Sequence, residues 1–234
     1  MKVEIWSDIM CPFCYIGKRR FEKALAEFPH RDKIEVEWKS FQLNPGLNAP
    51  AGQNIHEYLS ETKGWSLEYA RQVNSQVTKM AMEEGLTYDF DKAVVANSFD
   101  AHRLIQLAKS QGKADTMEEI LFKAYFTEGR DIADPTTLLE LGMTAGLGQV
   151  AINSMLESNE YADAVEHDIY ESQQIGVRGV PYFVFNDKYA VYGAQASETF
   201  LGALNKSWSE WDTNTDPVNT TSEGKTCEPG GDCL

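Results

Sequence analysis

Two cysteines separated by two residues, Cys11-Pro12-Phe13-Cys14, are the residues of this chain best suited to chemistry. They follow the strand-like run Val3-Glu4-Ile5-Trp6 and precede a helix-like stretch. A helix N-terminus stabilises a thiolate, and cysteines in such sites have pKa values of roughly 3.5–7, against ~8.5 for a free thiol. Pro12 suits the first helical position, which would leave Cys11 exposed at the positive helix end and Cys14 one turn inward. The spacing therefore predicts thiol–disulfide exchange, with Cys11 as the nucleophile and Cys14 as the resolving thiol.

The same cysteine spacing also occurs in haem and zinc sites. Attachment of a c-type haem needs a histidine where this chain has Tyr15, which excludes that use. A zinc site needs two further ligands, and the other two cysteines, Cys227 and Cys233, lie near the opposite end of the chain. We therefore expect no metal site and no organic cofactor.

Hydrophobic periodicity predicts the elements that position these thiols. Residues 2–7 and 34–38 are predicted strands, and residues 12–28 between them a helix, which together form a β-α-β unit. Six or seven helices are expected between residues 54 and 175, where strong helix formers are interrupted by glycines. The later elements are a hairpin of strands 182–185 and 189–192, with its turn at Asn186-Asp187, and a helix from Ser197 to about Trp208.

This order predicts an α/β fold in which helices flank a mixed sheet and a large all-helical domain is inserted. The expected sheet domain is discontinuous and comprises residues 1–50 and 176–208, with the helical domain at 51–175. Residues 209–234 are rich in Thr, Asn, Asp, Ser, Glu, Gly and Pro, and we expect a flexible acidic tail there.

Composition indicates a globular protein and limits its partners. Of the 234 residues, 42% are hydrophobic, and no apolar run is long enough to span a membrane. A formal charge of −15 repels nucleic acids and anionic membranes, so neither is an expected partner. The first strand begins without a secretory signal, and paired cysteines suit redox use where thiols are kept reduced, so we expect a cytoplasmic location.

A second candidate part of the site is Val180-Pro181, which precedes the late hairpin. Without an N–H, the proline leaves the backbone open beside Cys11, and Val180 can offer its own N–H and C=O to an extended substrate. The residues alone leave the peptide bond either cis or trans, because proline is also common at the start of an ordinary strand.

The chain resembles the DsbA family of the thioredoxin superfamily over about residues 1–208, and within it the FrnE-like branch. The resemblance is carried by four separate motifs: Ser7-Asp8-Ile9-Met10-Cys11-Pro12-Phe13-Cys14-Tyr15-Ile16-Gly17, Phe41-Gln42-Leu43-Asn44-Pro45, Asn97-Ser98-Phe99-Asp100-Ala101-His102-Arg103 and Gly176-Val177-Arg178-Gly179-Val180-Pro181-Tyr182-Phe183. It implies a thioredoxin-like fold with a helical insertion, a cis Val180-Pro181 bond, and dithiol–disulfide oxidoreductase or isomerase activity. Related hydroxychromene-carboxylate isomerases and kappa-class glutathione transferases have a serine where this chain has Cys11.

Other residues near the motifs have both a functional and a structural interpretation. Phe13 either tunes the redox balance or forms an exposed aromatic contact with substrate. The resemblance makes His102 and Arg178 candidates for a substrate groove, although a lone histidine is more often a packing residue. The cations Lys18, Arg19 and Arg20 are expected on a solvated helix face.

The tail carries the second cysteine pair, in Cys227-Glu228-Pro229-Gly230-Gly231-Asp232-Cys233. Its Pro-Gly-Gly turn would bring the two thiols together, and the chain leading to them is long enough to reach Cys11 and Cys14. The tail pair is therefore either an auxiliary redox pair that relays electrons or an accessory pair that oxidises adventitiously or binds a metal weakly.

These observations predict that the protein is a thiol–disulfide oxidoreductase or disulfide isomerase that acts on protein or small-molecule disulfides. The expected partners are disulfide-containing proteins or peptides and a cellular thiol reductant, either glutathione or a thioredoxin system. Two alternatives stay open: a redox-regulated chaperone or peptide-binding module, and a glutathione-dependent isomerase or transferase of the hydroxychromene-carboxylate isomerase type.

Overall fold

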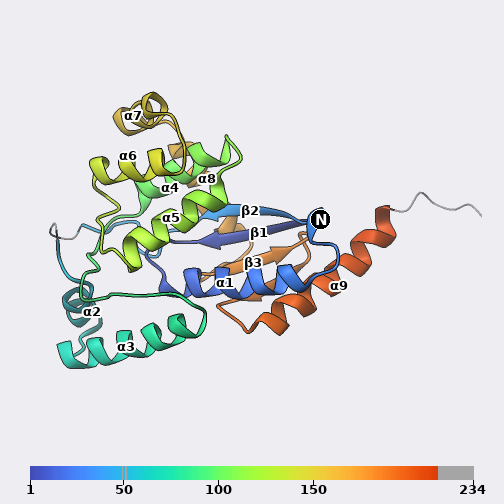
Figure 1. Cartoon of the computed structure of the whole chain (residues 1–234), viewed down its shortest axis with the longest axis horizontal. Coiled ribbons are helices and arrows are strands. Elements are labelled where there is room, and N and C mark those ends of the chain that lie inside the picture. The colour runs from blue at the N-terminus through green and yellow to red at the C-terminus, as the bar shows by residue number, and fades with distance from the viewer. Residues whose placement is uncertain (49, 51, 216–234) are drawn as a thin grey trace, which may run out of the picture.

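The centre of the protein is a four-stranded mixed sheet (Figure 1), seen in a computed structural model that describes residues 1–48, 50 and 52–215. Strand β1 (Lys2–Ser7) pairs in parallel with β2 (Glu35–Ser40) and antiparallel with β3 (Tyr182–Phe185). Strand β4 (Tyr189–Tyr192) pairs antiparallel with β3, which gives the order β2-β1-β3-β4. Helix α1 (Pro12–Glu27) connects β1 to β2, so the predicted β-α-β unit is confirmed.

The hairpin of β3 and β4 has the predicted boundaries. Its turn contains Asn186 and Asp187, whose φ angles are +51° and +53°. Two consecutive positive φ angles are typical of a tight hairpin turn, and Asn and Asp tolerate this conformation better than most residues. Local turn chemistry therefore sets the register that brings Tyr182 opposite Tyr192.

Within the described part of the chain, seven α-helices lie between β2 and β3, in agreement with the predicted six or seven. These helices are α2 (Ile55–Lys63), α3 (Leu67–Glu83), α4 (Phe99–Lys109), α5 (Ala114–Phe126), α6 (Pro135–Thr144), α7 (Gln149–Glu157) and α8 (Ala162–Gln174). Several begin at polar caps: the side chains of Asn54, Ser66 and Asp134 accept hydrogen bonds from the first turns of α2, α3 and α6. Figure 1 shows α2–α7 gathered at the end of the sheet to which β1 and β2 point.

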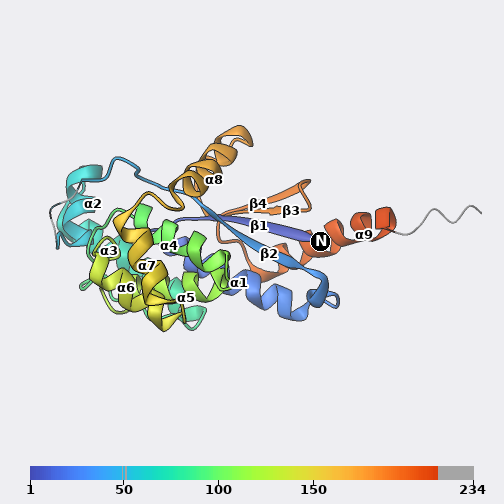
Figure 2. The same cartoon turned by 90° about the horizontal axis from the view of Figure 1, so that it is seen from above.

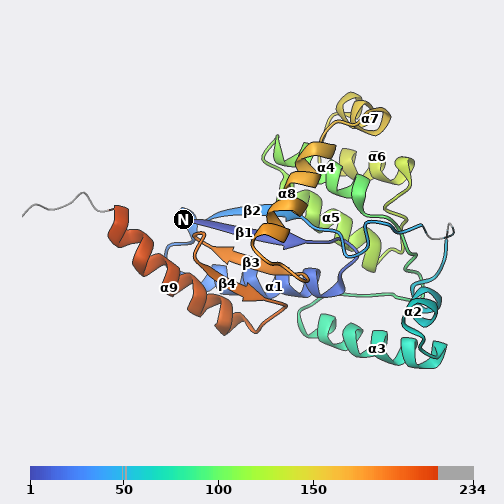
Figure 3. The same ribbon diagram turned by 180° about the vertical axis from the view of Figure 1, so that it is seen from behind.

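The two faces of the sheet are covered by different helices (Figure 2). Helices α1 and α9 (Ser197–Thr215) pack on one face, and their contact encloses a core that includes Ile5, Phe21, Phe183 and Phe200. Helix α8 covers the opposite face, where the backbone carbonyl of Asp168 accepts a hydrogen bond from the indole of Trp6 at 2.9 Å. In the rear view, α9 runs along the lower side of the sheet, away from α2–α7 (Figure 3).

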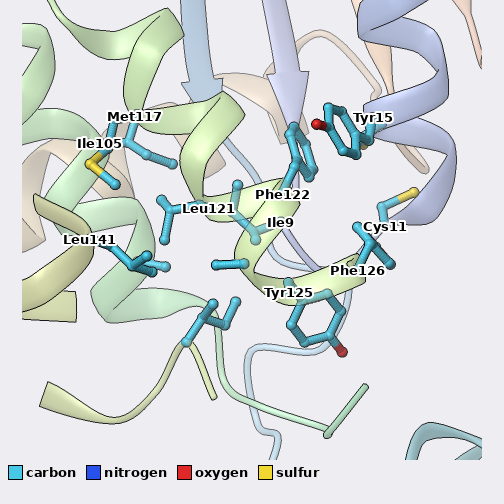
Figure 4. Packing of buried hydrophobic residues seen from close by; sticks show 14 of the residues in the cluster. Ile9, Cys11, Tyr15, Ile105, Met117, Leu121, Phe122, Tyr125, Phe126 and Leu141 are labelled. Atoms are coloured by element: carbon cyan, nitrogen blue, oxygen red, sulfur yellow. The ribbon is translucent and has the colours of Figure 1, made fainter. Parts of the chain in front are cut away.

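A second core fills the inserted helices and reaches the cysteine motif. Figure 4 shows Cys11 at its edge, Ile9 and Leu121 in its middle, and Leu141 on its far side. All four of these side chains are buried. The cysteine motif thus lies where the sheet joins the inserted helices.

One predicted boundary is wrong. Helix α9 does not end near Trp208 but continues to Thr215, so the start of the predicted flexible tail at residue 209 is helical. Trp211 packs on Trp208 with ring centroids 4.8 Å apart, and Glu210 accepts hydrogen bonds from Lys188 and Tyr189 next to β4. These tertiary contacts extend a helix whose composition gave no apolar period.

None of the described helices is long and apolar enough to cross a membrane. The proposed limits of the sheet and helical domains, at residues 50 and 176, stay a prediction.

Candidate functional site

Cys11 lies immediately before the first residue of α1, and Cys14 lies within the first turn. Cys11 has extended backbone angles, and its N–H donates to the carbonyl of Asp8 at 2.9 Å. The N–H of Cys14 donates to the carbonyl of Cys11 at 3.0 Å, and Pro12 occupies the first helical position. Both cysteines are free thiols in the structure. The local sequence therefore builds the helix-terminal pair that the spacing predicts.

The chain segment at Val180-Pro181 lies against Cys11. Its peptide bond is cis, and the Cys11 thiol donates to the carbonyl of Val180 at 3.4 Å. Two segments far apart in sequence therefore meet at one sulfur atom. Cys11 is, however, only 4% exposed, which corrects the prediction of an exposed residue at the helix end. Contact with Val180 and the inserted helices removes the accessibility that an isolated helix end would have.

Gly17 allows α1 to approach Pro181 closely. A Cβ atom added at Gly17 would lie 2.9 Å from Pro181 Cγ, closer than real Cβ atoms pack. Gly17 belongs to the first sequence motif, which by itself predicts no role for it. Its role is set by a proline that lies far along the chain, so no local signal could have identified it.

The environment of Cys14 keeps its thiol protonated. Cys14 is 1% exposed, and this burial, followed by the neighbouring Cys11 thiol, raises the pKa of Cys14 well above its usual value. The Asp8 backbone and the Ser7 hydroxyl act in the opposite direction and favour the thiolate, but their effect on the pKa of Cys14 is smaller. The two cysteines therefore differ in placement: one lies at the helix end beside Val180, and the other lies deeper as a neutral thiol.

Asp8 organises the loop that leads into the cysteine motif. Its carboxylate is fully buried and accepts hydrogen bonds from the N–H groups of Met10 at 3.2 Å and Leu43 at 2.7 Å. His102 lies behind it, 1% exposed, with Nε2 at 3.5 Å from Asp8 Oδ1. The structure thus places His102 in the interior and not on a surface, while Arg178 is exposed and Phe13 is 40% exposed.

Tyr88 is a residue near the motif that sequence reasoning missed. Its hydroxyl donates to the carbonyl of Pro12 at 2.7 Å, and its ring stacks on Tyr15 and Phe126. Burial, followed by the charge of Cys11, raises the pKa of Tyr88, so it stays an O–H donor. Tyr88 lies between α3 and α4 in sequence, in a segment without a motif.

Lys18 contradicts the expectation of a solvated helix face. It is 2% exposed and pairs with Glu22, with Asp115 at 3.1 Å and with Glu119 at 3.5 Å. Arg19 also pairs with Glu119, so cations of α1 bind carboxylates of α5. A buried cation is stable only when it is paired, and here the partners come from an element distant in sequence.

The predicted auxiliary pair, Cys227 and Cys233, lies outside the described residues. Within residues 1–48, 50 and 52–215, no group of three or more His, Cys, Asp or Glu side chains is arranged to hold a metal ion. The candidate dithiol site comprises Cys11, Cys14 and the Val180-Pro181 segment.

Comparisons with known proteins find relatives that match nearly the whole chain. A probable DsbA oxidoreductase from Streptomyces coelicolor is 38% identical and superimposes with a TM-score of 0.86 over 100% of this chain and 99% of its own. The YwbO protein of Bacillus subtilis, an uncharacterised relative, is 28% identical over 204 residues, which cover 86% of this chain and 94% of YwbO. A cytosolic disulfide reductase from Pseudomonas aeruginosa, DsbM, shares the fold, with a TM-score of 0.58 at 18% identity over 92% of this chain and 98% of its own.

The fold is thioredoxin-like, as the resemblance implied, with helices inserted between its second and third strands. The description of the matching family is a DSBA-like thioredoxin domain, and the match covers residues 2–205. Because this is most of the chain, the protein belongs to the DSBA-like thioredoxin domain family.

Proposed function

We propose that this protein is a thiol–disulfide oxidoreductase that uses Cys11 and Cys14 to exchange electrons with disulfides of proteins or small molecules. The observation that carries the proposal is the contact of the Cys11 thiol with the Val180 carbonyl at 3.4 Å, with Cys14 one turn inward on α1. This arrangement supports a site in which Cys11 is the nucleophile, Cys14 is the resolving thiol and the Val180 backbone binds the peptide substrate.

The proposed reaction is a two-step exchange between the substrate disulfide and the two cysteines. The Cys11 thiolate attacks one sulfur of a substrate disulfide, forms a mixed disulfide, and displaces the other substrate sulfur as a thiolate. Cys14 then gives its proton to the displaced substrate thiolate and attacks the Cys11 sulfur, which closes the Cys11–Cys14 disulfide and releases the second substrate thiolate. The substrate gains two electrons and the protein loses two, so a thiol reductant must restore the dithiol.

The limited exposure of Cys11 favours flexible substrates. Because Cys11 is only 4% exposed, its sulfur is reached more readily by a loose chain segment or a small disulfide than by a disulfide held rigidly in a fold. The relative from Streptomyces coelicolor bears the name of an oxidoreductase, and DsbM bears that of a cytosolic reductase whose structure was also solved with glutathione. These names support oxidoreductase activity, a cytoplasmic location and glutathione as the thiol reductant of this protein.

Substitution of each cysteine tests the proposal. We expect Cys11→Ser to abolish reduction of insulin disulfides, and Cys14→Ser to accumulate a mixed disulfide that mass spectrometry detects on Cys11. The auxiliary role of the tail is tested by replacing Cys227 and Cys233 together, which should lower turnover if the pair relays electrons.

Unchanged insulin reduction by Cys11→Ser would overturn the proposal. Retention of peptide binding and of aggregation suppression by that variant, without any disulfide turnover in the wild type, would favour the chaperone function. Tight glutathione binding without protein-disulfide turnover would favour the glutathione-dependent isomerase or transferase.

A further inference from the structure

The hydroxyl of Ser7 is buried at the end of β1 without a hydrogen-bond partner. Ser7 is 0% exposed, and its Oγ makes no hydrogen bond to any described residue. Its neighbour across the sheet, Ser40, is engaged elsewhere, because the Ser40 hydroxyl accepts a hydrogen bond from Gln106 at 3.1 Å. A buried polar group without a partner costs free energy and is rare in native proteins. The presence of this hydroxyl therefore calls for a reason other than the stability of the fold.

The alternation of β1 directs the Ser7 side chain toward α1. Val3 and Ile5 are buried in the core that β1 forms with α1 and α9, and Ser7 is the next residue on the same face of the strand. Two buried apolar residues are thus followed by a buried polar one. An apolar residue at this position would avoid the cost of the unpaired hydroxyl, so packing alone does not account for the serine.

Cys14 lies on the side of α1 that faces this end of the strand. Phe21 is two helical turns further along the same helix face, and it packs in the core with Ile5, its ring centroid 5.5 Å from that of Phe183. Cys14 therefore also faces the sheet, at the end of α1 nearest to Ser7, and it is 1% exposed. Burial raises the pKa of Cys14, whereas the Ser7 hydroxyl favours its thiolate. A hydroxyl without an acceptor thus lies beside a sulfur that must become an anion.

The backbone around Ser7 is held in place by hydrogen bonds. The Ser7 carbonyl accepts from the N–H of Phe41 at 3.0 Å. The buried carboxylate of Asp8 accepts from the N–H groups of Met10 at 3.2 Å and Leu43 at 2.7 Å. A donor that is fixed before the reaction needs little reorganisation when negative charge develops beside it.

We propose that Ser7 is a catalytic residue of the second exchange step, in which its hydroxyl donates a hydrogen bond to the Cys14 sulfur as that sulfur becomes a thiolate. This inference rests on the proposed function. In this step Cys14 gives its proton to the displaced substrate thiolate and attacks the Cys11 sulfur, and the bond between Cys11 and the substrate sulfur breaks. The hydroxyl keeps its own proton throughout. Ser7 therefore makes ionisation of Cys14 easier and leaves the balance of the reaction unchanged.

Dithiobis(nitrobenzoate) separates the two steps in one experiment, because each nitrobenzoate thiolate that it releases absorbs visible light. Attack by Cys11 releases the first thiolate at a rate proportional to the reagent concentration. Attack by Cys14 on the Cys11 sulfur releases the second at a rate independent of that concentration. Every protein in the comparison is the full chain with Cys227→Ser and Cys233→Ser, so the two thiols of the site are the only ones present.

Ser7→Ala should slow the second phase by about tenfold or more and change the first by less than about twofold, because hydrogen bonds to charged groups are the strong ones. Ser207→Ala is the matched control. Ser207 is also buried, and its hydroxyl has no hydrogen-bond partner among the described residues. It lies on α9 at the opposite end of α1, where the adjacent Trp208 packs on Phe28, so both phases should stay unchanged.

Stability measurements separate catalysis from a structural role. Neither variant should have a lower urea midpoint than the parent protein, because each removes a hydroxyl that makes no hydrogen bond in the fold. A lower midpoint for Ser7→Ala than for Ser207→Ala would assign the Ser7 hydroxyl a structural role and overturn the inference.

The kinetic outcomes separate this inference from the proposed function. A second phase of Ser7→Ala within about twofold of the parent rate overturns the inference, as does an equal slowing of both phases, which indicates a distorted site. A second phase of the parent protein that scales with reagent concentration also overturns it, because Cys14 would then react directly with the reagent. These three results leave Cys11 as a reactive thiol. Absence of the first phase in the parent protein defeats the proposed function itself.

Discussion

The buried carboxyl of Glu118 should make the stability of the protein fall as the pH rises. Glu118 is 1% exposed on α5, and its Oε2 has no hydrogen-bond partner among the described residues. Burial raises its pKa from 4.5 to about 8; the charge of Lys18 opposes this shift, and the charges of Asp115 and Asp8 add to it. The fold therefore favours the protonated acid.

The sign and the size of the effect follow from proton linkage. The folded state keeps the Glu118 proton at pH values above 4.5, where the unfolded state releases it. The contribution of Glu118 to the free energy of unfolding is therefore complete below pH 4.5 and is lost as the pH rises to about 8. At about 1.4 kcal/mol per pH unit the whole span corresponds to about 5 kcal/mol, which is an upper limit because water entry and local relaxation reduce it. We expect a loss of about 2–5 kcal/mol relative to Glu118→Gln between pH 4.5 and 8.

Urea denaturation of the two proteins at half-unit pH steps measures this difference directly. The glutamine variant keeps the shape of the side chain but cannot ionise, so its stability should depend less on pH than that of the wild type. Glu166→Gln is the matched control, because it makes the same change at an exposed position on α8. If the curves for wild type and Glu118→Gln run parallel within about 0.5 kcal/mol, the carboxyl is already ionised or hydrated in the fold and the reasoning is refuted.

Three further predictions test the contacts around the dithiol site and the sheet. Gly17→Ala should lower insulin-disulfide turnover by about tenfold or more, because the new Cβ would lie 2.9 Å from the ring of Pro181. Gly202→Ala is the control and should leave turnover unchanged, because a Cβ at that position meets no neighbouring atom. Tyr88→Phe should lower the free energy of unfolding by about 1 kcal/mol in urea, since the 2.7 Å hydrogen bond to the Pro12 carbonyl is lost; an unchanged midpoint would contradict this. Burial tends to raise the pKa of Glu37, but hydrogen bonding and charge from nearby lysines outweigh burial and lower this pKa to about 2. The contribution of the Glu37 carboxylate to the stability of the fold is therefore lost as the pH falls from 4.5 toward 2. Glu37→Gln should therefore lose less stability than the wild type in acid unfolding.

The elements that carry the site could be predicted because their signals are local. The alternation of residues 182–185 and 189–192, separated by Asn186-Asp187, contains both strands and the turn that joins them. The run before Cys11 and the proline after it likewise specify a strand, a loop and a helix start within a few residues. These elements are determined by residues that are close together in the sequence, so the predicted strands and the predicted start of α1 agree with the structure.

Features set by distant partners could not be predicted in this way. Lys18 has the sequence context of a surface lysine, and it is buried because Asp115 and Glu119 of α5 lie against it. The end of α9 at Thr215 depends on contacts with residues near β4, which composition does not reveal. Gly17 likewise acquires its importance only from a proline far along the chain.

The proposed order of attack follows from the asymmetry between the two cysteines. Cys11 lies at the helix end with its sulfur against Val180, where a substrate sulfur and a substrate backbone can both be held. Cys14 is buried and its pKa is raised, so it competes poorly for external disulfides, and it can attack only a sulfur already attached to its neighbour. Once Cys11 is in a mixed disulfide it no longer carries a charge that opposes ionisation of Cys14, while the Ser7 hydroxyl and the Asp8 backbone still favour the Cys14 thiolate. Formation of the mixed disulfide thus makes ionisation of Cys14 easier, and the Cys14 thiolate then attacks the Cys11 sulfur and releases the substrate.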